Sequence, residues 1–573
     1  MRLSISKSKN ATSYYVIKSI YENGKKSTRV VEKLGTAEEL EKKLNGQDIV
    51  EWANSYIDEL NKKEKAMTRD IMIKYSPTKL IPKEEQRFFN GGYLFLQKIY
   101  HELKLDEICE SISKKYKFSY NLNSILSRLI YARVIFPASK LETLKLSKRF
   151  IEQPDFKLQH IYRSLEVISK ETDFIQSTLY KNSREISKRR TGILYYDCTN
   201  YYFEIEEAQG LKQFCYSKDH KPNPAVQMGL FMDADGIPLA FNINCGNTNE
   251  QITMKPLEQL ILSDFDLSKF VVCTDAGLAS TDNRLFNDEK GRAFVTVQSV
   301  KKLKSHIKKW VLDQEGWHLP GELEVFNISA LNENDAGMKE KVFYKERWIN
   351  EDGLEQRIIV TYSIKYRDYL RSVRNSQIER AKKAIETKNV KVSRNQNDYK
   401  RLISQQSVTP DGEVADKEIY EIDTKKIKEE EMYDGYYAVC TDLEDDVETI
   451  VKINKRRWEI EECFRIMKSE FKARPVYLSR DDRISAHFMI CFIALSIYRL
   501  LEKKLQEKFT CHEIIDGLRS MNFSMVKGEG YIPTYTRNDF TDALHDAYQF
   551  RTDYQIVTSA QMKKIISNTK GAK

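Results

Sequence analysis

The sequence predicts an α/β protein, and three observations lead to that class. Residues 86–188 carry apolar side chains at helical spacing, so this segment is expected to be helical. From residue 191 the pattern changes to short apolar runs that end in polar or turn residues, which is typical of strands. From about 435 another strand-like run leads into a long helical segment that continues to about 505.

Length and composition indicate a multidomain globular protein. The chain has 573 residues, too many for one core, so we expect about three or four folded units. Hydrophobic residues make up 41% and charged residues 31%, which excludes a disordered chain. Nine cysteines are scattered without a CxxC pair, which indicates unpaired thiols in a reducing cytoplasm. The first ten residues lack the apolar core of a signal peptide.

The N-terminal half is expected to begin with a β-hairpin and continue as helices. Two β-prone runs flank Asn23-Gly24 and predict a hairpin module over 1–40. We expect a helical linker over 41–85 and a helical domain over 86–188. One helix of that domain has Asn123 or Ser124 placed to cap it and ends before Pro137; its apolar face carries Leu122, Ile125, Leu126, Leu129 and Ile130.

The C-terminal half is expected to hold a sheet in two parts. The first part covers 189–300, with strands in ILYYDCTN, AVQMGLFMDADGIPLAFNIN and FVVCTDAG and a turn at Asp235-Gly236. Residues 301–430 are expected to contain short strands and a basic helix, 431–505 a strand followed by a long helical region, and 506–573 a mixed cap. The most apolar stretch, 488–501, is shorter than the ~20 residues of a membrane span, so a buried helix is expected there.

Positive charge is concentrated in one stretch, although the whole chain carries only +9. Residues 365–401 contain twelve Lys or Arg against four Asp or Glu. Two interpretations are open, namely a surface that contacts phosphates and a solvated helix of mixed charge.

Two strand-like runs end in an aspartate. Asp197 follows the apolar run ILYY and Asp275 follows KFVVCT. A buried carboxylate without a partner is costly, so it is normally paired or bound to metal. Ends of strands in open α/β sheets are where sites form, and two such ends can lie side by side. Asp275 precedes Ala276-Gly277, so a simple turn is the alternative interpretation there.

A third acid lies in NKRRWEIEECFRIMKSEFKARP. No proline interrupts Lys455 to Lys472, so a continuous helix is expected, with Arg457, Glu461 and Lys468 on one face. An ordinary amphipathic helix with salt links is the alternative. Together with the two aspartates, Glu461 would supply oxygen ligands for two divalent cations ~3.5–4 Å apart, which is the arrangement that cleaves phosphodiesters. Arg457 and Lys468 would hold phosphates beside it.

The order of these residues resembles the DDE transposases of the IS4 superfamily, and most of all its IS1634 branch. The helix has the family's Arg-x3-Glu-x6-Lys spacing, which selects Glu461 over the neighbouring Glu462. Other segments that carry the resemblance are YDCTNYYFE, YSKDHKPNPAVQMGLFMDADGIPLAFNINCGNTNE, TDAGLAS, YDGYYAV and RRWEIEECFRIMKSEFKARPVY. The family's tyrosine position holds Asn454 here, so the role of that tyrosine is not carried over.

The resemblance implies that the protein is a cut-and-paste transposase. It also implies an RNase H-like core in two parts, 189–300 and 431–505, which a β-rich insertion over 301–430 interrupts. Asp197, Asp275 and Glu461 would be the catalytic acids that bind two Mg²⁺ ions, with Mn²⁺ as a substitute. Terminal inverted repeats and target DNA would be the partners, with a homodimer in the synaptic complex, in the cytoplasm of a prokaryote. The residues expected to contact DNA are Arg457, Lys468, Arg456, Lys218, His220 and Lys221.

Several alternatives remain open at this point. The loop SKDHKP, 217–222, is either a DNA contact or an exposed turn. In relatives an aromatic residue of the insertion holds a flipped base; Trp310, Trp317 and Trp348 lie in that segment, and each is either such a residue or part of a core. A nuclease without strand transfer would use the same acids, and a DNA-binding relative without catalysis is the non-enzyme alternative.

Overall fold

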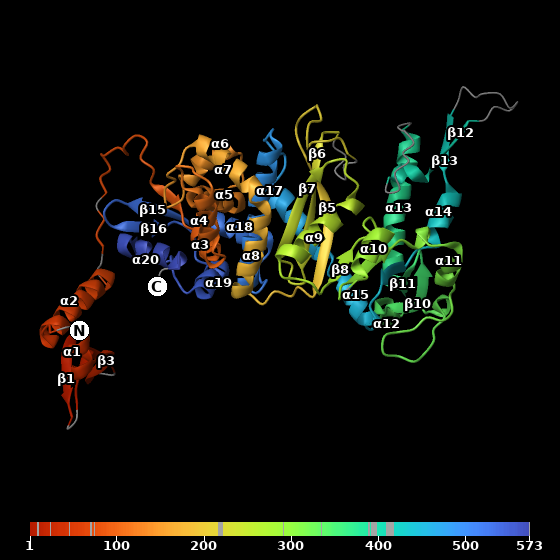
Figure 1. Ribbon diagram of the computed structural model, residues 1–573. Coiled ribbons are helices and arrows are strands. Elements are labelled where there is room, and N and C mark those ends of the chain that lie inside the picture. The colour runs from red at the N-terminus through yellow and green to blue at the C-terminus, as the bar shows by residue number, and fades with distance from the viewer. Residues whose placement is uncertain are drawn as a thin grey trace. The chain divides into compact units, whose positions relative to one another are not determined.

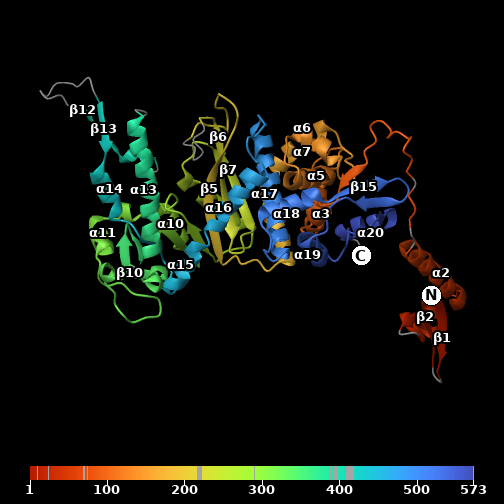
Figure 2. The same ribbon diagram turned by 180° about the vertical axis from the view of Figure 1, so that it is seen from behind.

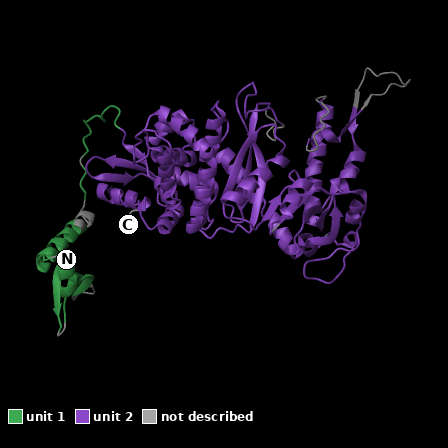
Figure 3. Ribbon diagram, viewed as in Figure 1, with its two compact units in different colours: residues 1–85 green, residues 86–573 purple. Residues whose placement is uncertain are grey.

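The computed structural model describes residues 1–8, 11–22, 25–44, 46–68, 71–73, 75–215, 222–289, 291–333, 335–387, 390, 398–407 and 418–571. It contains two compact units, residues 1–85 and 86–573 (Figure 3).

The smaller unit is an antiparallel sheet with two helices. Its elements are β1 (Arg2–Lys7), β2 (Thr12–Glu22), β3 (Lys25–Thr36), α1 (Ala37–Leu44) and α2 (Ile49–Thr68), and its sheet has the order β1-β2-β3. Glu22 pairs with Lys25, as expected for a hairpin around Asn23-Gly24, whose two turn residues lie outside the described part. The sequence did not predict β1, because it is short, polar and largely exposed.

The larger unit begins with helices that pack together with the C-terminal end of the chain. Asn121, and not Asn123 or Ser124, caps α5 by accepting from Ser124 N at 2.9 Å. The strand β4 (Phe88–Asn90) pairs with β15 (Asn522–Val526), so the sheet β17-β16-β15-β4 joins both ends of this unit. The helices are α3 (Tyr93–Glu102), α4 (Leu105–Lys115), α5 (Leu122–Ile135), α6 (Lys140–Ser147), α7 (Leu158–Lys170), α8 (Thr172–Ile186), α18 (Cys511–Ser520), α19 (Asp539–Tyr548) and α20 (Ser559–Thr569); β16 is Gly530–Pro533 and β17 is Val557–Thr558.

An eight-stranded mixed sheet forms the centre of the larger unit (Figure 1), with the order β10-β11-β14-β9-β8-β5-β6-β7. β5 pairs antiparallel with β6 and parallel with β8, and β8 pairs parallel with β9. Its strands are β5 (Ile193–Tyr202), β6 (Ala225–Asp233), β7 (Pro238–Cys245), β8 (Val271–Thr274), β9 (Ala293–Gln298), β10 (Phe343–Glu351), β11 (Leu354–Tyr362) and β14 (Tyr436–Thr441).

The segment predicted as an insertion contributes two strands to this same sheet. β10 and β11 form a hairpin, and β11 pairs antiparallel with β14. The sequence could not show this, because strand-like runs do not reveal which sheet they join. The other elements here are η2 (Val300–Lys302), α11 (Ser305–Leu312), η3 (Ile328–Ala330), α12 (Ala336–Glu340), α13 (Ile364–Glu386), η4 (Tyr399–Leu402), β12 (Ile403–Ser407), β13 (Glu418–Ile422) and α14 (Thr424–Glu431).

Helices lie on both faces of the sheet. One face is covered by α9 (Met254–Asp264), which follows η1 (Glu250–Ile252), and by α10 (Thr281–Asn287). The other face packs against α15 (Val447–Lys455), α16 (Trp458–Arg465) and the π-helix η5 (Ile466–Glu470).

The long helix α17 (Asp481–Lys504) connects this core with the helices of residues 93–186. Figures 1 and 2 both show α17 between β7 and those helices, and it contacts α3, α5, α7 and β7. Its length and composition would suit a membrane span, but 94% of its most apolar window is buried inside the protein. The predicted buried helix is therefore present. All nine cysteines, which lie in the described part, are free thiols.

Candidate active site

Strand β5 presents alternate side chains to the helices that follow β14. The hydroxyl of Tyr195 donates to the carbonyl oxygen of Ile453 at 3.0 Å, and Thr199 Oγ1 accepts from Lys468 Nζ at 2.6 Å. Side chains two residues apart share one face of a strand. Asp197 therefore points to the same side, between Tyr195 and Thr199. Its carboxylate is 7% exposed, and its Oδ1 accepts from the Cys198 N–H at 2.8 Å.

The second aspartate comes directly after the end of the neighbouring strand. The parallel register pairs Tyr195 with Cys273 and β8 ends at Thr274, so a continuation of that register would bring Asp275 opposite Asp197. Neighbouring strands lie about 4.7–4.9 Å apart. Asp275 is also the turn residue that the alternative interpretation suggested, because its Oδ1 accepts from the backbone N–H groups of Gly277 and Leu278 at 2.9 and 3.2 Å. The two roles are compatible, since both turn hydrogen bonds use the same oxygen.

Arg457 lies close to Glu461 and within electrostatic range of both aspartates. Its Nη1 lies 3.3 Å from Glu461 Oε1, one helical turn away. Burial lowers the pKa of Arg457, but Tyr437 and the carboxylates of Glu461, Asp197 and Asp275 raise it by more. A single guanidinium thus feels all three predicted acids. The three acids, far apart in sequence, therefore all lie within electrostatic range of one half-buried cation.

The helix that carries Glu461 is not continuous, so the prediction for Lys455 to Lys472 was wrong. α15 ends at Lys455, and α16 begins at Trp458 after a turn at Arg456. From Ile466 the chain forms a π-helix, in which the Phe471 N–H donates to the Ile466 carbonyl at 3.0 Å. A π turn carries one extra residue and rotates the side chains that follow it. Nothing in the composition of this segment, which lacks Gly and Pro, indicates either irregularity.

Lys468 still reaches the strand that carries the first acid. Its ammonium donates to Thr199 and lies 5.6 Å from the ring centre of Tyr201, both on β5. Lys468 is therefore next to Asp197 across the interface between η5 and β5. Thr199 was not among the predicted site residues, although its spacing of two from Asp197 would have suggested it.

The sequence did not predict Tyr437 as a site residue either. This tyrosine contacts Asn454, which occupies the position of the family's tyrosine. Asn454 Nδ2 donates to the Tyr437 hydroxyl at 3.1 Å, and that hydroxyl is one of the groups that raise the pKa of Arg457. A phenol from β14 therefore lies beside Asn454. No local signal in the sequence predicts this contact.

The remaining residues predicted to contact DNA are either engaged in an ion pair or outside the described part of the chain. Arg456 binds Glu459 through Nε and Nη2 at 3.0 and 2.9 Å, so it is engaged within the helix. Lys218, His220 and Lys221 lie outside the described residues. Of the tryptophans, Trp317 is fully buried in a core, Trp310 packs on that core, and Trp348 is 45% exposed on β10.

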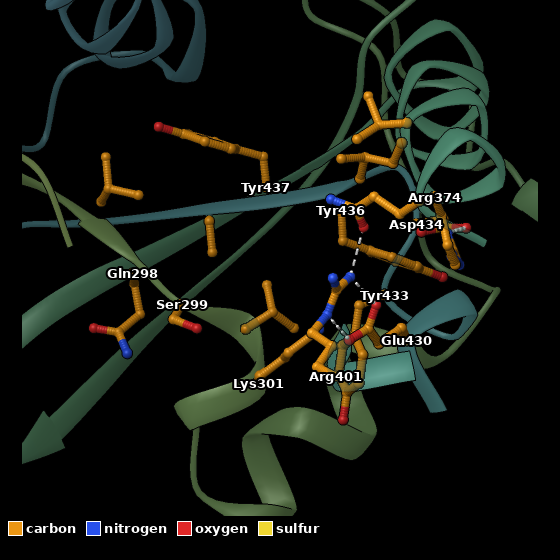
Figure 4. Close-up of a pocket in the computed structure, with 16 residues that line it drawn as sticks. Gln298, Ser299, Lys301, Arg374, Arg401, Glu430, Tyr433, Asp434, Tyr436 and Tyr437 are labelled. Atoms are coloured by element: carbon orange, nitrogen blue, oxygen red, sulfur yellow. Dashed lines mark hydrogen bonds and ion pairs between the residues drawn. The ribbon is translucent and has the colours of Figure 1, made fainter. Parts of the chain in front are cut away.

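A cavity of about 410 Å³ lies in the segment 297–438 and contains none of the three acids (Figure 4). Within it Arg401 pairs with Glu430 at 2.9 Å, and the buried Arg374 pairs with Asp434. These arginines belong to the basic stretch 365–401. Part of its positive charge is therefore used in ion pairs with acids outside the stretch, which neither sequence interpretation anticipated.

The donor set fits hard divalent cations. Oxygens are the ligands of Mg²⁺, and Asp197, Asp275 and Glu461 offer only oxygens. The oxygens of these three acids are not all within 4.8 Å of one another. Among the described residues, only Asp542, His545 and Asp553 have ligand atoms gathered that closely. The oxygens that bind two ions ~3.5–4 Å apart can lie farther from one another than the oxygens that bind a single ion. The carboxylates of Asp542 and Asp553 both bind Arg551, at 2.8 and 2.7 Å, so they are already neutralised.

Two acids at or just after neighbouring parallel strands, with a third on a packing helix, form an arrangement that could bind divalent cations and act on phosphates. A family model described as "Transposase DDE domain" matches residues 203–497, just over half of the chain. The chain therefore belongs to the DDE transposase family, a class of phosphoryl-transfer enzymes that generally use a divalent metal. The match includes Asp275 and Glu461 and begins six residues after Asp197.

Comparison with solved structures gives a weaker similarity. A cryo-EM structure of the piggyBac transposase synaptic complex with hairpin DNA aligns over 85% of this chain and 88% of that chain. The two are 8% identical and the TM-score is 0.36, which does not establish a shared fold. No curated protein matches the chain.

Proposed function

We propose that this chain is the transposase of an insertion sequence, most like the IS1634 branch of the IS4 superfamily. It would bind the terminal inverted repeats of its own element, cut there, and join the freed 3′-hydroxyl to target DNA. The family membership supports the class of enzyme. The observation that supports the chemistry is that Arg457 pairs with Glu461 and lies within electrostatic range of Asp197 on β5 and of Asp275 just after β8, the parallel neighbour of β5.

The sheet topology supports an RNase H-like core. Strands β7, β6 and β5 are antiparallel neighbours, and β8 and β9 continue the sheet in parallel with β5. We propose that these five strands are the catalytic core and that the chain between β9 and β14 is the insertion. The acids then lie on β5, just after β8, and on α16, the second helix after β14.

Each residue of the site has a proposed role. Asp197, Asp275 and Glu461 would hold the divalent cations, Mg²⁺ or Mn²⁺. Two bound cations activate a water or a 3′-hydroxyl and stabilise the leaving oxygen. Arg457 pairs with Glu461 and offsets part of the negative charge of the three acids, and it would contact a phosphate once metal is bound. Lys468 would bind a phosphate of the strand that lies over Asp197.

DNA is the proposed partner, and synapsis of two ends calls for a homodimer on DNA. We propose that residues 86–188 contribute to binding the DNA ends, and that the protein acts in the prokaryotic cytoplasm, where its nine free thiols remain reduced.

The sequences that flank the reading frame provide the substrate for a direct test. The purified chain is incubated with Mg²⁺ and a DNA that carries those flanks. We expect cuts at terminal inverted repeats by the wild type and none by Asp197→Asn, which keeps the shape of the side chain but loses its charge. Retained cleavage in that variant would contradict the assignment of Asp197.

Pre-cut ends separate a transposase from a nuclease. The ends are supplied with a target plasmid, so that only strand transfer remains to be catalysed. A transposase joins the ends to the plasmid, whereas a nuclease of the same fold leaves both unjoined. A chain that binds the ends but neither cuts nor joins them would be the inactive DNA-binding relative.

A further inference from the structure

A small pocket behind the site collects cationic side chains without an acid. Its volume is about 150 Å³, and it lies between the end of α5, the start of α6, the loop after η5, and α17. The residues that line it are Arg133, Pro137, Ala138, Ser139, Lys140, Lys472, Arg474, Pro475, Val476, Tyr477, Leu478 and His487. Four of them carry or can carry a positive charge besides His487, and no carboxylate is among them.

Two of these cations are buried. Arg133 is 5% exposed and Lys140 is 6% exposed. Neither forms an ion pair within the part of the chain that the structure describes. Burying a charge without a counter-ion costs free energy, so buried Lys and Arg are normally paired. The unusual feature is therefore two buried cations that share one pocket.

The pocket is held in place by hydrogen bonds to backbone. Arg133 donates from Nη1 to the carbonyl of Phe471 at 3.0 Å and from Nη2 to that of Ala138 at 3.2 Å. Its Nε is buried without a hydrogen-bond partner. The carbonyls fix the guanidinium but do not neutralise it, so its positive charge remains available.

The histidine orients the lysine. His487 Nε2 lies 3.1 Å from the Ala473 carbonyl, which can only accept, so Nε2 carries the proton. Nδ1 then accepts from Lys140 Nζ at 3.4 Å. This leaves two N–H donors of the ammonium for another acceptor. Burial, followed by Lys140 and Arg133, lowers the pKa of His487 well below its usual value, which keeps the ring neutral.

We infer that this pocket is a binding site for a tetrahedral oxyanion of the phosphate type, held by Lys140 and Arg133 with Lys472 and Arg474 nearby. At about 150 Å³ it is much smaller than the roughly 300–1,000 Å³ of pockets for whole organic ligands. The phosphate has two possible sources, a phosphodiester of a nucleic-acid strand and a free phosphate. The inference does not depend on the proposed function, because it rests on the pocket alone.

The protonation of Lys140 on anion binding can be measured independently of the affinity. Burial, and then the charge of Arg133, lowers the pKa of Lys140 to about 7. It also faces the neutral His487 and the thiol of Cys491, and Lys472, Arg474 and Tyr477 line the same pocket. A bound anion favours the charged ammonium, so binding at pH 8 should take up a proton. Calorimetry in two buffers of different ionisation enthalpy measures that uptake.

The test compares Lys140→Met with Lys145→Met in the full chain. Lys145 lies on the same helix, is 64% exposed, and pairs with Glu142 at 3.0 Å, so it is a matched control. With inorganic phosphate as the probe, we expect it to raise the melting temperature of the wild type and of Lys145→Met. Lys140→Met should bind phosphate at least ten times more weakly. Without phosphate it should melt no lower than the wild type, because it removes a buried charge, and this shows that it is folded.

A second arm identifies the source of the phosphate. Binding of a hydroxyl-ended DNA duplex is measured at several salt concentrations. If the DNA backbone is the ligand, Lys140→Met lowers the slope of log K against log salt by about 1. An unchanged slope with loss of phosphate binding assigns the pocket to free phosphate. If Lys140→Met matches Lys145→Met with both probes, or if phosphate affects none of the three proteins, the inference is overturned.

Discussion

The ammonium of Lys468 donates a 2.6 Å hydrogen bond to Thr199 Oγ1, two residues beyond Asp197 on the same face of β5. This contact ties η5 to the strand that carries the first acid, although 269 positions separate the two residues. A phosphate bound by Lys468 would therefore lie next to Asp197.

Lys468→Met should weaken DNA binding at all sequences alike, because a lysine contacts phosphates rather than bases. The slope of log K against log salt should fall by about 1. Lys452→Met is the control, since Lys452 is 70% exposed and pairs with Glu448 on α15. Fluorescence anisotropy across a salt series measures both slopes, and equal slopes for the two variants would exclude Lys468 from the DNA interface.

Glu461→Gln should reduce cleavage while Glu462→Gln should not. Glu461 lies beside Arg457, the cation within electrostatic range of both aspartates, whereas Glu462 pairs with Arg465 at 2.5 Å. We expect a loss of about 10²–10³-fold for Glu461→Gln, the scale for removing one group that stabilises charge in the transition state. Initial rates of cutting on flank DNA give the comparison. A larger loss of cleavage rate in Glu462→Gln would show that Glu462, and not Glu461, is the third acid.

Arg374 should matter for stability and not for DNA binding. It is 5% exposed and pairs with Asp434, which is 6% exposed. Breaking a buried pair costs about 3–5 kcal/mol, and without Arg374 only the half-exposed Arg371, whose Nε lies 3.7 Å from Asp434 Oδ2, is left to compensate that carboxylate. Arg374→Met should therefore lower the free energy of unfolding by about that amount. Arg380→Met, on the exposed side of the same helix, should change it little, as urea unfolding of the two variants would show.

Asp442 should make stability depend on pH between about 4 and 6. Burial raises its pKa from 3.8 to about 6, against the opposing effect of the Phe294 N–H, which its Oδ1 accepts at 2.8 Å. Because the folded value is the higher one, stability is present at low pH and is lost as the pH rises through 6. Asp442→Asn should be more stable than the wild type at pH 7.5, by about 2 kcal/mol, and no more stable at pH 4. The exposed Asp445→Asn serves as control, and an equal gain at both pH values would refute the explanation.

Much of this architecture was predictable from local pattern. The apolar runs before Asp197 and Asp275 are strands, Asp235-Gly236 is a turn, and residues 488–501 lie in a buried helix. These features depend on side-chain alternation and on residues within one element, which a sequence displays directly.

What was missed depends on contacts between distant segments. The parallel pairing of β5 and β8 is fixed by packing of both strands, so the sequence predicted that the two strands could be neighbours but not that they are. The joining of β11 to β14 and the contact of Tyr437 with Asn454 have the same origin. The turn at Arg456 and the π-helix from Ile466 have no composition signal, since helix breaks are predicted from Gly and Pro and this segment has neither.

Anomalous X-ray scattering from crystals grown with Mn²⁺ would locate the ions directly. We predict two peaks ~3.5–4 Å apart, bound by the carboxylates on β5, after β8 and on α16, and absent in Asp275→Asn. Crystals in which manganese binds only at Asp542, His545 and Asp553, or nowhere near Asp197, would contradict the catalytic centre described above.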